Sequence, residues 1–284
     1  MTFPRDRHRL GIGDVADRSL PLETCVATVR RAMDAGLNVI DTAPNYEGGY
    51  SEQIVGEALQ GRREQMFVIS KIDVLDAPVE PQIDASLHRL RMDHTDAFVF
   101  HNVSDLEIFR KLMEPDGGFD QVTSCISSGK TRHRGISSHH PEVLEAALLA
   151  GFCDLVMFPV GPFVDHRYED KILPLAKSKG VGTVCFKTFG AGMLGDTAGY
   201  QKPLPEGVTN PIKLTVAECV HYTLTLAPDI ALLGLSNPSE QDEAFSAALD
   251  FTPLPPERMD AIRARATEAR RGKGPCWWNP DPEA

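Results

Sequence analysis

The six cysteines of this chain include no CxxC pair, the spacing that zinc sites and thiol redox motifs commonly use. Most of them stand inside apolar runs such as GTVCFK, residues 182–187. We therefore expect buried, reduced thiols in a cytoplasmic protein, and no metal site. The six are Cys25, Cys125, Cys153, Cys185, Cys219 and Cys276.

Basic clusters and long apolar runs are also missing. The chain has 29 Lys and Arg against 40 Asp and Glu, a formal net charge of −11, and no lysine–arginine block longer than a few residues. This charge balance disfavours nucleic acid and anionic membrane surfaces as partners. No window approaches the roughly 18 apolar residues of a membrane span, and the first residues lack the apolar core of a signal peptide. We expect a protein that does not associate with membranes.

Short apolar runs alternate with longer amphipathic segments almost from end to end. The segments between the runs repeat apolar residues at three- and four-residue spacing, and several end in glycine, as helices often do. Such alternation predicts parallel strand–helix units. The expected strands are residues 9–13, 37–41, 66–70, 97–101, 133–137, 154–158, 182–186 and 230–234.

Eight such units in 284 residues suit a (β/α)₈ TIM barrel, which typically needs about 250 residues. A doubly wound sheet is the alternative, but GIGDVADRS lacks the GxGxxG turn expected after its first strand. We therefore predict the α/β class and a single barrel domain over residues 1–284, as a monomer or small homo-oligomer. Residues 252–284 would form a C-terminal helix and tail at the barrel mouth. Trp277 and Trp278 on this tail would wall the substrate site or form a dimer interface.

Three consecutive expected strands end in an ionisable side chain, namely Asp41, Lys71 and His101, and Tyr46 follows the second strand. Each has an ordinary interpretation by itself: a turn cap, a lysine reaching solvent, a core histidine and an aromatic packed on the rim. The carboxyl ends of barrel strands, however, converge on one face, where active sites lie. The four residues together predict an active site.

The chemistry of this cluster centres on the phenol of Tyr46. A free tyrosine has a pKa of about 10, which is high for acid–base catalysis near neutrality. Lowering that pKa by two to three units takes about 3–4 kcal/mol, roughly what one ammonium at about 4 Å supplies at an effective dielectric near 20. Lys71 can be that ammonium, and Asp41 opposes its deprotonation. With His101 orienting a carbonyl or sharing the proton, the set predicts a proton donor for carbonyl reduction.

Residues 36–59, GLNVIDTAPNYEGGYSEQIVGEAL, resemble the signature of the aldo-keto reductases. The similarity continues through FVISKID, DAFVFHN, GKTRHRGISSHHPEVLEAAL, ILPLAKSKGVGTVCFKTFGAGML and LLGLSNPSEQDEA, and so covers about residues 8–250. The resemblance implies a barrel that binds a nicotinamide cofactor, NAD(P)(H), in an extended form. It implies hydride transfer between this cofactor and a small aldehyde, ketone or alcohol. The implied catalytic tetrad is Asp41, Tyr46, Lys71 and His101.

The residues expected to hold the nicotinamide depart from the family pattern. The family usually places Ser-Asn after strand five, whereas this chain has Ser137 and Ser138, and VMFPVGPF lacks the usual glutamine after strand six. Phe186 replaces the usual tyrosine under the nicotinamide and can still stack. The resemblance therefore implies fewer contacts to the carboxamide.

Strand seven is followed by residues suited to the pyrophosphate. Lys187 is either its partner or a structural lysine on the rim. Gly190 and Gly192 would let the backbone approach a ligand. The adjacent histidines His139 and His140 are expected near the cofactor pocket and are poor metal ligands without a third partner.

The loop after strand eight, residues 234–245, contains no lysine or arginine. The family's NADP-preferring members hold the 2′-phosphate there with basic residues. Glu240 stands about where their arginine would be; it would repel a 2′-phosphate and accept a bond from a 2′-hydroxyl, unless it is merely a first-turn helix acid. Glu243 matches the family's adenine contact, and Ser236 is a further expected cofactor contact. NAD(H) is thus at least as well supported as NADP(H).

Two other functions are compatible with parts of this pattern. Missing carboxamide contacts would suit a nicotinamide-cofactor-binding regulatory subunit with little turnover, like the barrel subunits of some ion channels, although such a binder needs no complete tetrad. Lys71 as a Schiff-base lysine in an aldolase-like barrel would leave Tyr46 and Asp41 unexplained. The identity of the carbonyl substrate does not follow from the sequence.

Overall fold

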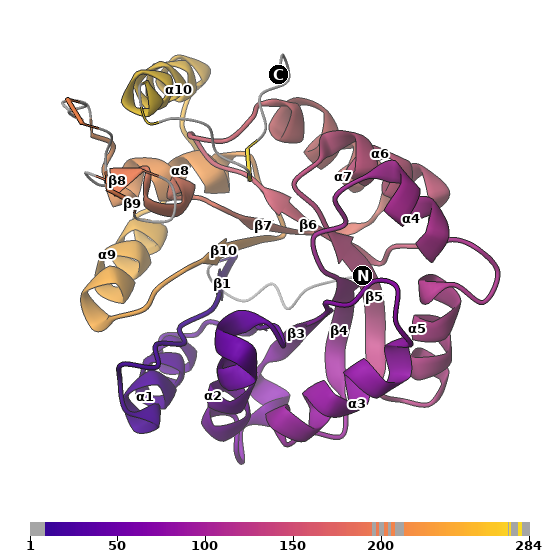
Figure 1. Ribbon diagram of the computed structural model, residues 1–284. Helices are drawn as coiled ribbons and strands as arrows, with labels where there is room; N and C mark the ends of the chain where they lie inside the picture. The colour runs from indigo at the N-terminus through magenta and orange to yellow at the C-terminus, as the bar shows by residue number, and fades with distance from the viewer. Residues whose placement is uncertain are drawn as a thin grey trace.

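The computed structural model describes residues 9–194, 197–198, 202–203, 206–207, 213–271, 273 and 278–279. Eight parallel strands close into a barrel in the order β1-β10-β7-β6-β5-β4-β3-β2 (Figure 1). All eight predicted strands are confirmed, and closure rules out the doubly wound alternative. The strands are β1 (Leu10–Ile12), β2 (Val39–Asp41), β3 (Phe67–Ile72), β4 (Thr95–Phe100), β5 (Thr131–Ser137), β6 (Leu155–Pro159), β7 (Gly182–Phe186) and β10 (Ile230–Leu233).

Helices surround the ring of strands on the outside (Figure 1). Local signals in the sequence explain several of their ends. Gly151 and Gly180 end α6 and α7 in the left-handed region, and Thr215 with Glu218 forms a capping box at the start of α8. The helices are α1 (Leu22–Asp34), α2 (Tyr50–Ala58), α3 (Val79–Leu90), α4 (Leu106–Leu112), α5 (Gly118–Ser127), α6 (Pro141–Ala150), α7 (Leu173–Lys179), α8 (Val216–Thr225), α9 (Pro238–Leu249) and α10 (Pro256–Arg270).

Shorter elements lie in the connections. They are η1 (Tyr46–Gly49), η2 (Arg63–Gln65), η3 (Tyr168–Ile172), η4 (Gly190–Gly192) and the antiparallel pair β8 (Thr197–Ala198) and β9 (Lys202–Pro203). No helix in the described part of the chain is long and apolar enough to cross a membrane.

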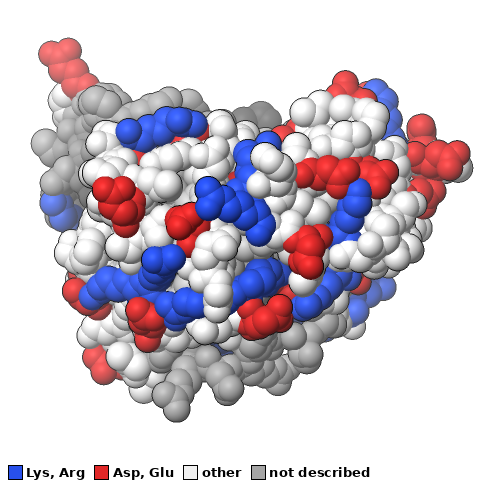
Figure 2. Space-filling model, turned by 90° about the horizontal axis from the view of Figure 1, so that it is seen from below, with Lys and Arg blue, Asp and Glu red and all other residues white. Residues whose placement is uncertain are grey.

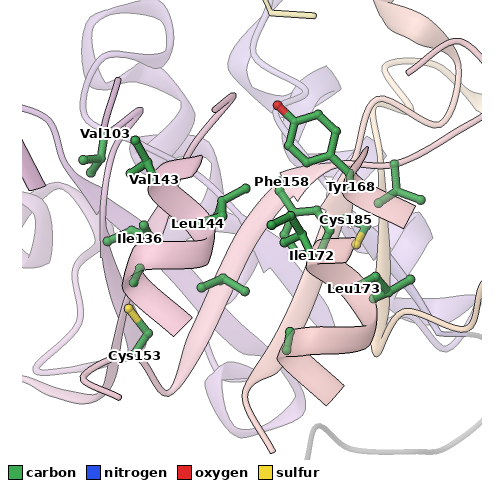
Figure 3. Packing of buried hydrophobic residues seen from close by; sticks show 14 of the residues in the cluster. Val103, Ile136, Val143, Leu144, Cys153, Phe158, Tyr168, Ile172, Leu173 and Cys185 are labelled. Carbon is green, nitrogen blue, oxygen red and sulfur yellow. The ribbon is translucent and has the colours of Figure 1, made fainter. Parts of the chain in front are cut away.

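Apolar side chains fill the space on both sides of the strands. Inside the barrel, residues such as Val39, Ile69 and Val184 form one cluster. Between the strands and α6 and α7, a larger cluster includes Leu144 and Phe158 (Figure 3). Because successive strand residues point to opposite faces, one short apolar run supplies both clusters.

The described cysteines are all free and buried. Burial raises the pKa of the Cys153 thiol to about 12, so this thiol stays protonated and unreactive. The expectation of buried, reduced thiols is confirmed for Cys25, Cys125, Cys153, Cys185 and Cys219. Cys276 lies outside the described residues.

Basic and acidic side chains alternate on the face formed by α1, α2 and α3 (Figure 2). Arg91 Nη1 lies 2.7 Å from Glu57 Oε2 and joins α3 to α2, and Arg62 pairs with Asp34 at 2.9 Å. Exposed pairs of this kind contribute at most about 1 kcal/mol each. On this face the positive charge is therefore interleaved with negative charge.

The C-terminal segment is held against the barrel by buried and partly buried polar contacts. Arg263 Nη2 of α10 lies 2.5 Å from Glu169 Oε1, and the hydroxyl of Tyr222 donates to Glu169 Oε2 at 2.7 Å. Farther along, Asn279 Oδ1 accepts from the backbone N–H of Asp165 at 2.7 Å. Trp278 is fully buried in the chain's own core, which is neither of the two positions expected for it. Trp277 lies outside the described residues.

Candidate active site

A cavity of about 1210 Å³ is lined by residues at the carboxyl ends of the strands. Asp41 is the last residue of β2, Lys71 is the penultimate residue of β3, and His101 directly follows β4. Tyr46 begins η1, just beyond β2. The structure therefore brings all four residues of the expected tetrad to the wall of one cavity.

Asp41 and Lys71 form a buried ion pair, with side chains only 3% and 1% exposed. The ammonium of Lys71 donates to Asp41 Oδ1 and also to the carbonyl oxygen of Thr42, the latter at 3.0 Å. Burial raises the pKa of the Asp41 carboxyl, and Lys71, His101 and a hydrogen bond with Tyr46 only partly offset this rise. Each charge is tolerable here because the other is present.

The rings of Tyr46 and His101 lie side by side at the cavity wall. Their centroids are 5.7 Å apart and their planes meet at 80°, an edge-to-face arrangement. Lys71 Nζ lies 5.4 Å from the centre of the Tyr46 ring. A positive charge at this distance would stabilise negative charge that develops on the Tyr46 side chain.

Asp73 completes this corner of the cavity, and the sequence reasoning missed it. It follows β3 and lines the cavity, and its Oδ1 lies 2.5 Å from His101 Nδ1. Asp73 stands two positions after Lys71 in FVISKID. Alternate residues of an extended chain point to the same side, so this spacing could have predicted that Asp73 lies on the cavity side with Lys71. Asp14, after β1, is a second missed residue of the cavity wall, and burial raises the pKa of its carboxyl.

The expected nicotinamide contacts are only partly brought together. Ser137 and Phe186 line the cavity, and Ser137 Oγ accepts from the backbone N–H of Asn102 at 2.9 Å. Ser138 is fully buried, does not line the cavity, and donates its hydroxyl to the carbonyl oxygen of Val103 at 2.8 Å. The contact expected from Ser138 to the cofactor stays a prediction, and in the structure its hydroxyl points away from the cavity.

His139 also lines the cavity, as expected from its position after strand five. Its ring centroid lies 5.3 Å from that of Phe186. Burial lowers the pKa of His139 to about 3, and the positive charges of Lys187, His101 and His140 act in the same direction. His139 is therefore neutral at physiological pH and presents a flat, uncharged ring beside Phe186.

The loop after β7 has an irregular backbone. Lys187, Gly190 and Ala191 all have positive φ, at 71°, 64° and 49°. A Cβ on Gly190 would lie 2.9 Å from the Cβ of Phe163, so the packing of the loop itself explains this glycine. Lys187 and Ala191 line the cavity and Gly190 does not; Gly192 ends η4.

The loop after β10 brings Ser236, Glu240 and Glu243 to the cavity wall. Glu240 Oε2 accepts from the backbone N–H of Ser236 at 2.8 Å, and Asn237 caps α9 by accepting from the N–H of Glu240 at 3.1 Å. Among the described residues that line the cavity there is no arginine, and the lysines are Lys71 and Lys187. No group of three or more His, Cys, Asp or Glu in the described chain is placed to hold a metal ion.

Comparisons with known proteins identify the family and the fold of the chain. The profile of the Aldo/keto reductase family matches residues 9–226. "Aldo-keto reductase YhdN" of Bacillus subtilis (strain 168) is 27% identical over 186 residues, or 61% of this chain and 54% of the relative. "NADH-specific methylglyoxal reductase" of Escherichia coli (strain K12) is 26% identical over 210 residues, or 66% and 63%. The alignments with these two relatives thus span less than two thirds of their lengths.

Longer alignments exist with other proteins. "L-galactose dehydrogenase" of Arabidopsis thaliana is 27% identical over 266 residues, covering 82% of this chain and 80% of the relative. The crystal structure of an aldo-keto reductase from Klebsiella pneumoniae in complex with NADPH has a TM-score of 0.69 at 19% identity and covers 90% of both chains. That likeness shows the barrel fold. Since the family profile matches most of the sequence, the chain belongs to the aldo/keto reductase family.

Proposed function

We propose that the protein is an NAD(P)-dependent oxidoreductase that interconverts an aldehyde or ketone and the corresponding alcohol. The observation that carries this proposal is the buried Lys71–Asp41 pair beside the rings of Tyr46 and His101 at the cavity wall. A buried ion pair adds little to stability and is costly to maintain, so its position against a phenol favours a role in proton transfer.

The donor set of the cavity fits a nicotinamide dinucleotide. Phe186 and neutral His139 offer flat faces for the nicotinamide, and Lys187 offers a positive charge for the pyrophosphate. Glu243 and the start of α9 form the wall where the adenosine end would lie. When bound, the reduced cofactor supplies the hydride that is added to the carbonyl carbon.

The chain's own groups handle the proton. Tyr46 donates its hydroxyl proton to the carbonyl oxygen as negative charge develops there, and Lys71 stabilises the phenolate that remains. Asp41 accepts a hydrogen bond from Lys71 and holds it in place. His101, whose ring lies beside that of Tyr46, contacts the reacting oxygen. In alcohol oxidation the Tyr46 phenolate takes the proton back.

Substitution of Tyr46 by Phe tests this assignment. The variant should lose at least about a hundredfold to a thousandfold in kcat for reduction of small aldehydes such as methylglyoxal, since it has no proton to give. Its Kd for NADH, measured by calorimetry, should stay within about threefold of the wild type. The matched control is Tyr50→Phe, which alters a tyrosine packed under Arg18 outside the cavity and should leave kcat unchanged.

NAD(H) rather than NADP(H) is the cofactor we propose. The carboxylate of Glu240 accepts from the backbone N–H of Ser236, just before the N-cap of α9, and so already occupies a donor that a phosphate could otherwise use. A 2′-phosphate would also face the negative charge of Glu240 itself. The family contains both kinds, since the Klebsiella structure holds NADPH and the Escherichia coli relative is named as NADH-specific.

Paired titrations of NADH and NADPH test the choice of cofactor. We expect NADH to bind at least tenfold more tightly, a difference of about 1.4 kcal/mol, and Glu240→Arg to reduce or reverse that ratio. Glu257→Gln, which removes an exposed first-turn acid of α10, serves as the control and should leave the ratio unchanged. Equal or tighter binding of NADPH by the wild type would rule out this preference.

A cofactor-binding regulatory subunit is the second candidate. Ser138 faces Val103 instead of the cavity, which leaves fewer contacts to the carboxamide and would suit a binder with little turnover. Such a protein would bind NADH, fail to reduce any aldehyde of a broad panel, and show no difference between wild type and Tyr46→Phe. A Schiff-base role for Lys71 would leave its pairing with Asp41 and its position beside the Tyr46 ring unexplained.

A further inference from the structure

Asp73 and His101 form a hydrogen-bonded pair at the edge of the cavity. Asp73 Oδ1 lies 2.5 Å from His101 Nδ1, well within hydrogen-bonding distance. The two side chains are only 16% and 17% exposed, so little water competes for this contact. They come from neighbouring strands, which end side by side at the same height of the barrel.

The chemistry of a carboxylate fixes the direction of this hydrogen bond. An ionised carboxylate has acceptors and no donor, so His101 Nδ1 must carry the proton. In the neutral imidazole the other nitrogen, Nε2, is then left with its lone pair, and in the imidazolium it donates. Asp73 therefore decides what Nε2 can offer to a substrate oxygen.

The second oxygen of Asp73 gives an independent sign that this carboxylate is not merely structural. Oδ2 is buried and has no hydrogen-bond partner among the described residues. Buried carboxylate oxygens that serve the fold are normally satisfied by backbone N–H groups or cations. Asp73 thus directs its hydrogen bonding to His101 at the cavity wall.

We propose that Asp73 is a positioning residue that holds His101 in one tautomer, with Nδ1–H on the carboxylate and Nε2 toward the reacting oxygen. The proposal rests on the proposed reductase function, in which Nε2 of neutral His101 accepts from the hydroxyl of the alcohol and Nε2–H of the imidazolium donates to the carbonyl oxygen. It extends the active site from four residues to five and gives Asp73 a role through His101 rather than on the substrate.

The other ionisable groups around His101 do not replace Asp73 in this role. Asp41 at the end of β2 is bound to Lys71 of β3, and Tyr46 faces the ring edge-on. His139, from the loop after β5, is neutral because burial lowers its pKa to about 3. The described carboxylate bonded directly to the His101 ring is that of Asp73.

Nitrogen-15 NMR of the free protein tests the tautomer without a substrate. In histidine-labelled wild type, with His101 assigned by the His101→Gln variant, we expect the Nδ1–H form at neutral pH. Asp73→Ala should move His101 to the Nε2–H form that predominates in free histidine. Asp76→Asn, an exposed carboxylate three residues later, is the control and should leave the spectrum of His101 unchanged. An Nε2–H signal in the wild type, or Nδ1–H in Asp73→Ala, would overturn the proposal.

Kinetics test the consequence for the reaction. Asp73→Ala should lower kcat for aldehyde reduction by about ten- to a hundredfold and alter its pH profile, with the Kd for NADH unchanged. Asp73→Asn should recover part of the activity, because its amide oxygen also accepts from Nδ1–H. In a His101→Gln background, Asp73→Ala should cause no further loss, whereas additive losses would refute a role through His101. If the reductase function itself is wrong, wild type and variants are equally inactive while the tautomer result still stands.

Discussion

The two halves of the barrel rim are built in different ways. The half that follows β2, β3 and β4 holds Asp41, Lys71 and His101, which lie in or directly beside strands; Lys71 binds Asp41, and His101 binds Asp73. The half that follows β5, β7 and β10 uses loops, with left-handed residues such as Lys187 and a helix start at Asn237. Strand ends hold charged groups rigidly for chemistry, whereas loops shape a longer surface suited to an extended ligand.

The largest effect should come from breaking the reactive half. Lys71→Met leaves Asp41 buried without its ammonium, so we expect a loss of about 3–5 kcal/mol in the free energy of unfolding and at least about a thousandfold in kcat. Urea denaturation and aldehyde reduction measure the two losses. The double variant with Asp41→Asn should recover stability but no activity. Full activity in Lys71→Met would remove the ion pair from the proposed mechanism.

A smaller effect should appear in acid at the boundary between the halves. The pKa of His139 is lowered from its ordinary 6.5 to about 3 in the folded protein, so between these values only the unfolded chain takes up the proton. Stability from this group is present above pH 6.5 and is lost as the pH falls toward 3, with about 2 kcal/mol gone at pH 5. Unfolding free energies at pH 7 and pH 5 measure it.

The matched variants are His139→Gln and His140→Gln. The first should reduce the difference in unfolding free energy between pH 7 and pH 5, because glutamine does not titrate. The second replaces a partly exposed neighbour that does not line the cavity, and it should keep nearly the full difference because His140 is the smallest of the causes that lower the pKa of His139. An unchanged difference in His139→Gln would show that other groups cause the acid sensitivity.

The smallest effect should come from the tail that supports the cofactor half. Lys187 Nζ lies 5.6 Å from the ring centre of buried Trp278, and such a contact is worth about 1 kcal/mol. Trp278→Leu should therefore weaken NADH binding about fivefold by calorimetry and leave kcat nearly unchanged. A fall in kcat comparable to that of Lys71→Met would show that the tail acts on the reactive half instead.

Some features were predictable because they depend on neighbours in the sequence. Each apolar run of four to six residues can only be buried as a strand here, since helices need longer periodic segments. Asp41 and Tyr46 lie in one short motif, and the alternation of side chains along β3 places Lys71 on the same cavity wall. The convergence of these residues with His101 then follows from closing a parallel barrel, in which all strand ends share one face.

Other features depended on contacts between distant segments. Ser137 and Ser138 are the same residue type and adjacent in the sequence. Because successive residues of an extended chain point to opposite sides, Ser137 lines the cavity, whereas Ser138 points away and donates to Val103. The sequence predicts Trp278 at the substrate site or in a dimer interface, yet its side chain is fully buried in the core. The residues that decide these orientations are distant in the sequence, so no local sequence pattern includes them.

The sequence by itself determined the barrel, its strand ends and the gathering of Asp41, Tyr46, Lys71 and His101, because hydrophobic periodicity and parallel topology fix where strand ends meet. Only the tertiary structure decided that Asp73 bonds to His101, 28 positions away, and that Glu240 accepts from the backbone N–H of Ser236 before α9. Hydrogen bonds act over about 3 Å, so they are settled by the final packing of neighbouring loops and not by the order of residues along the chain.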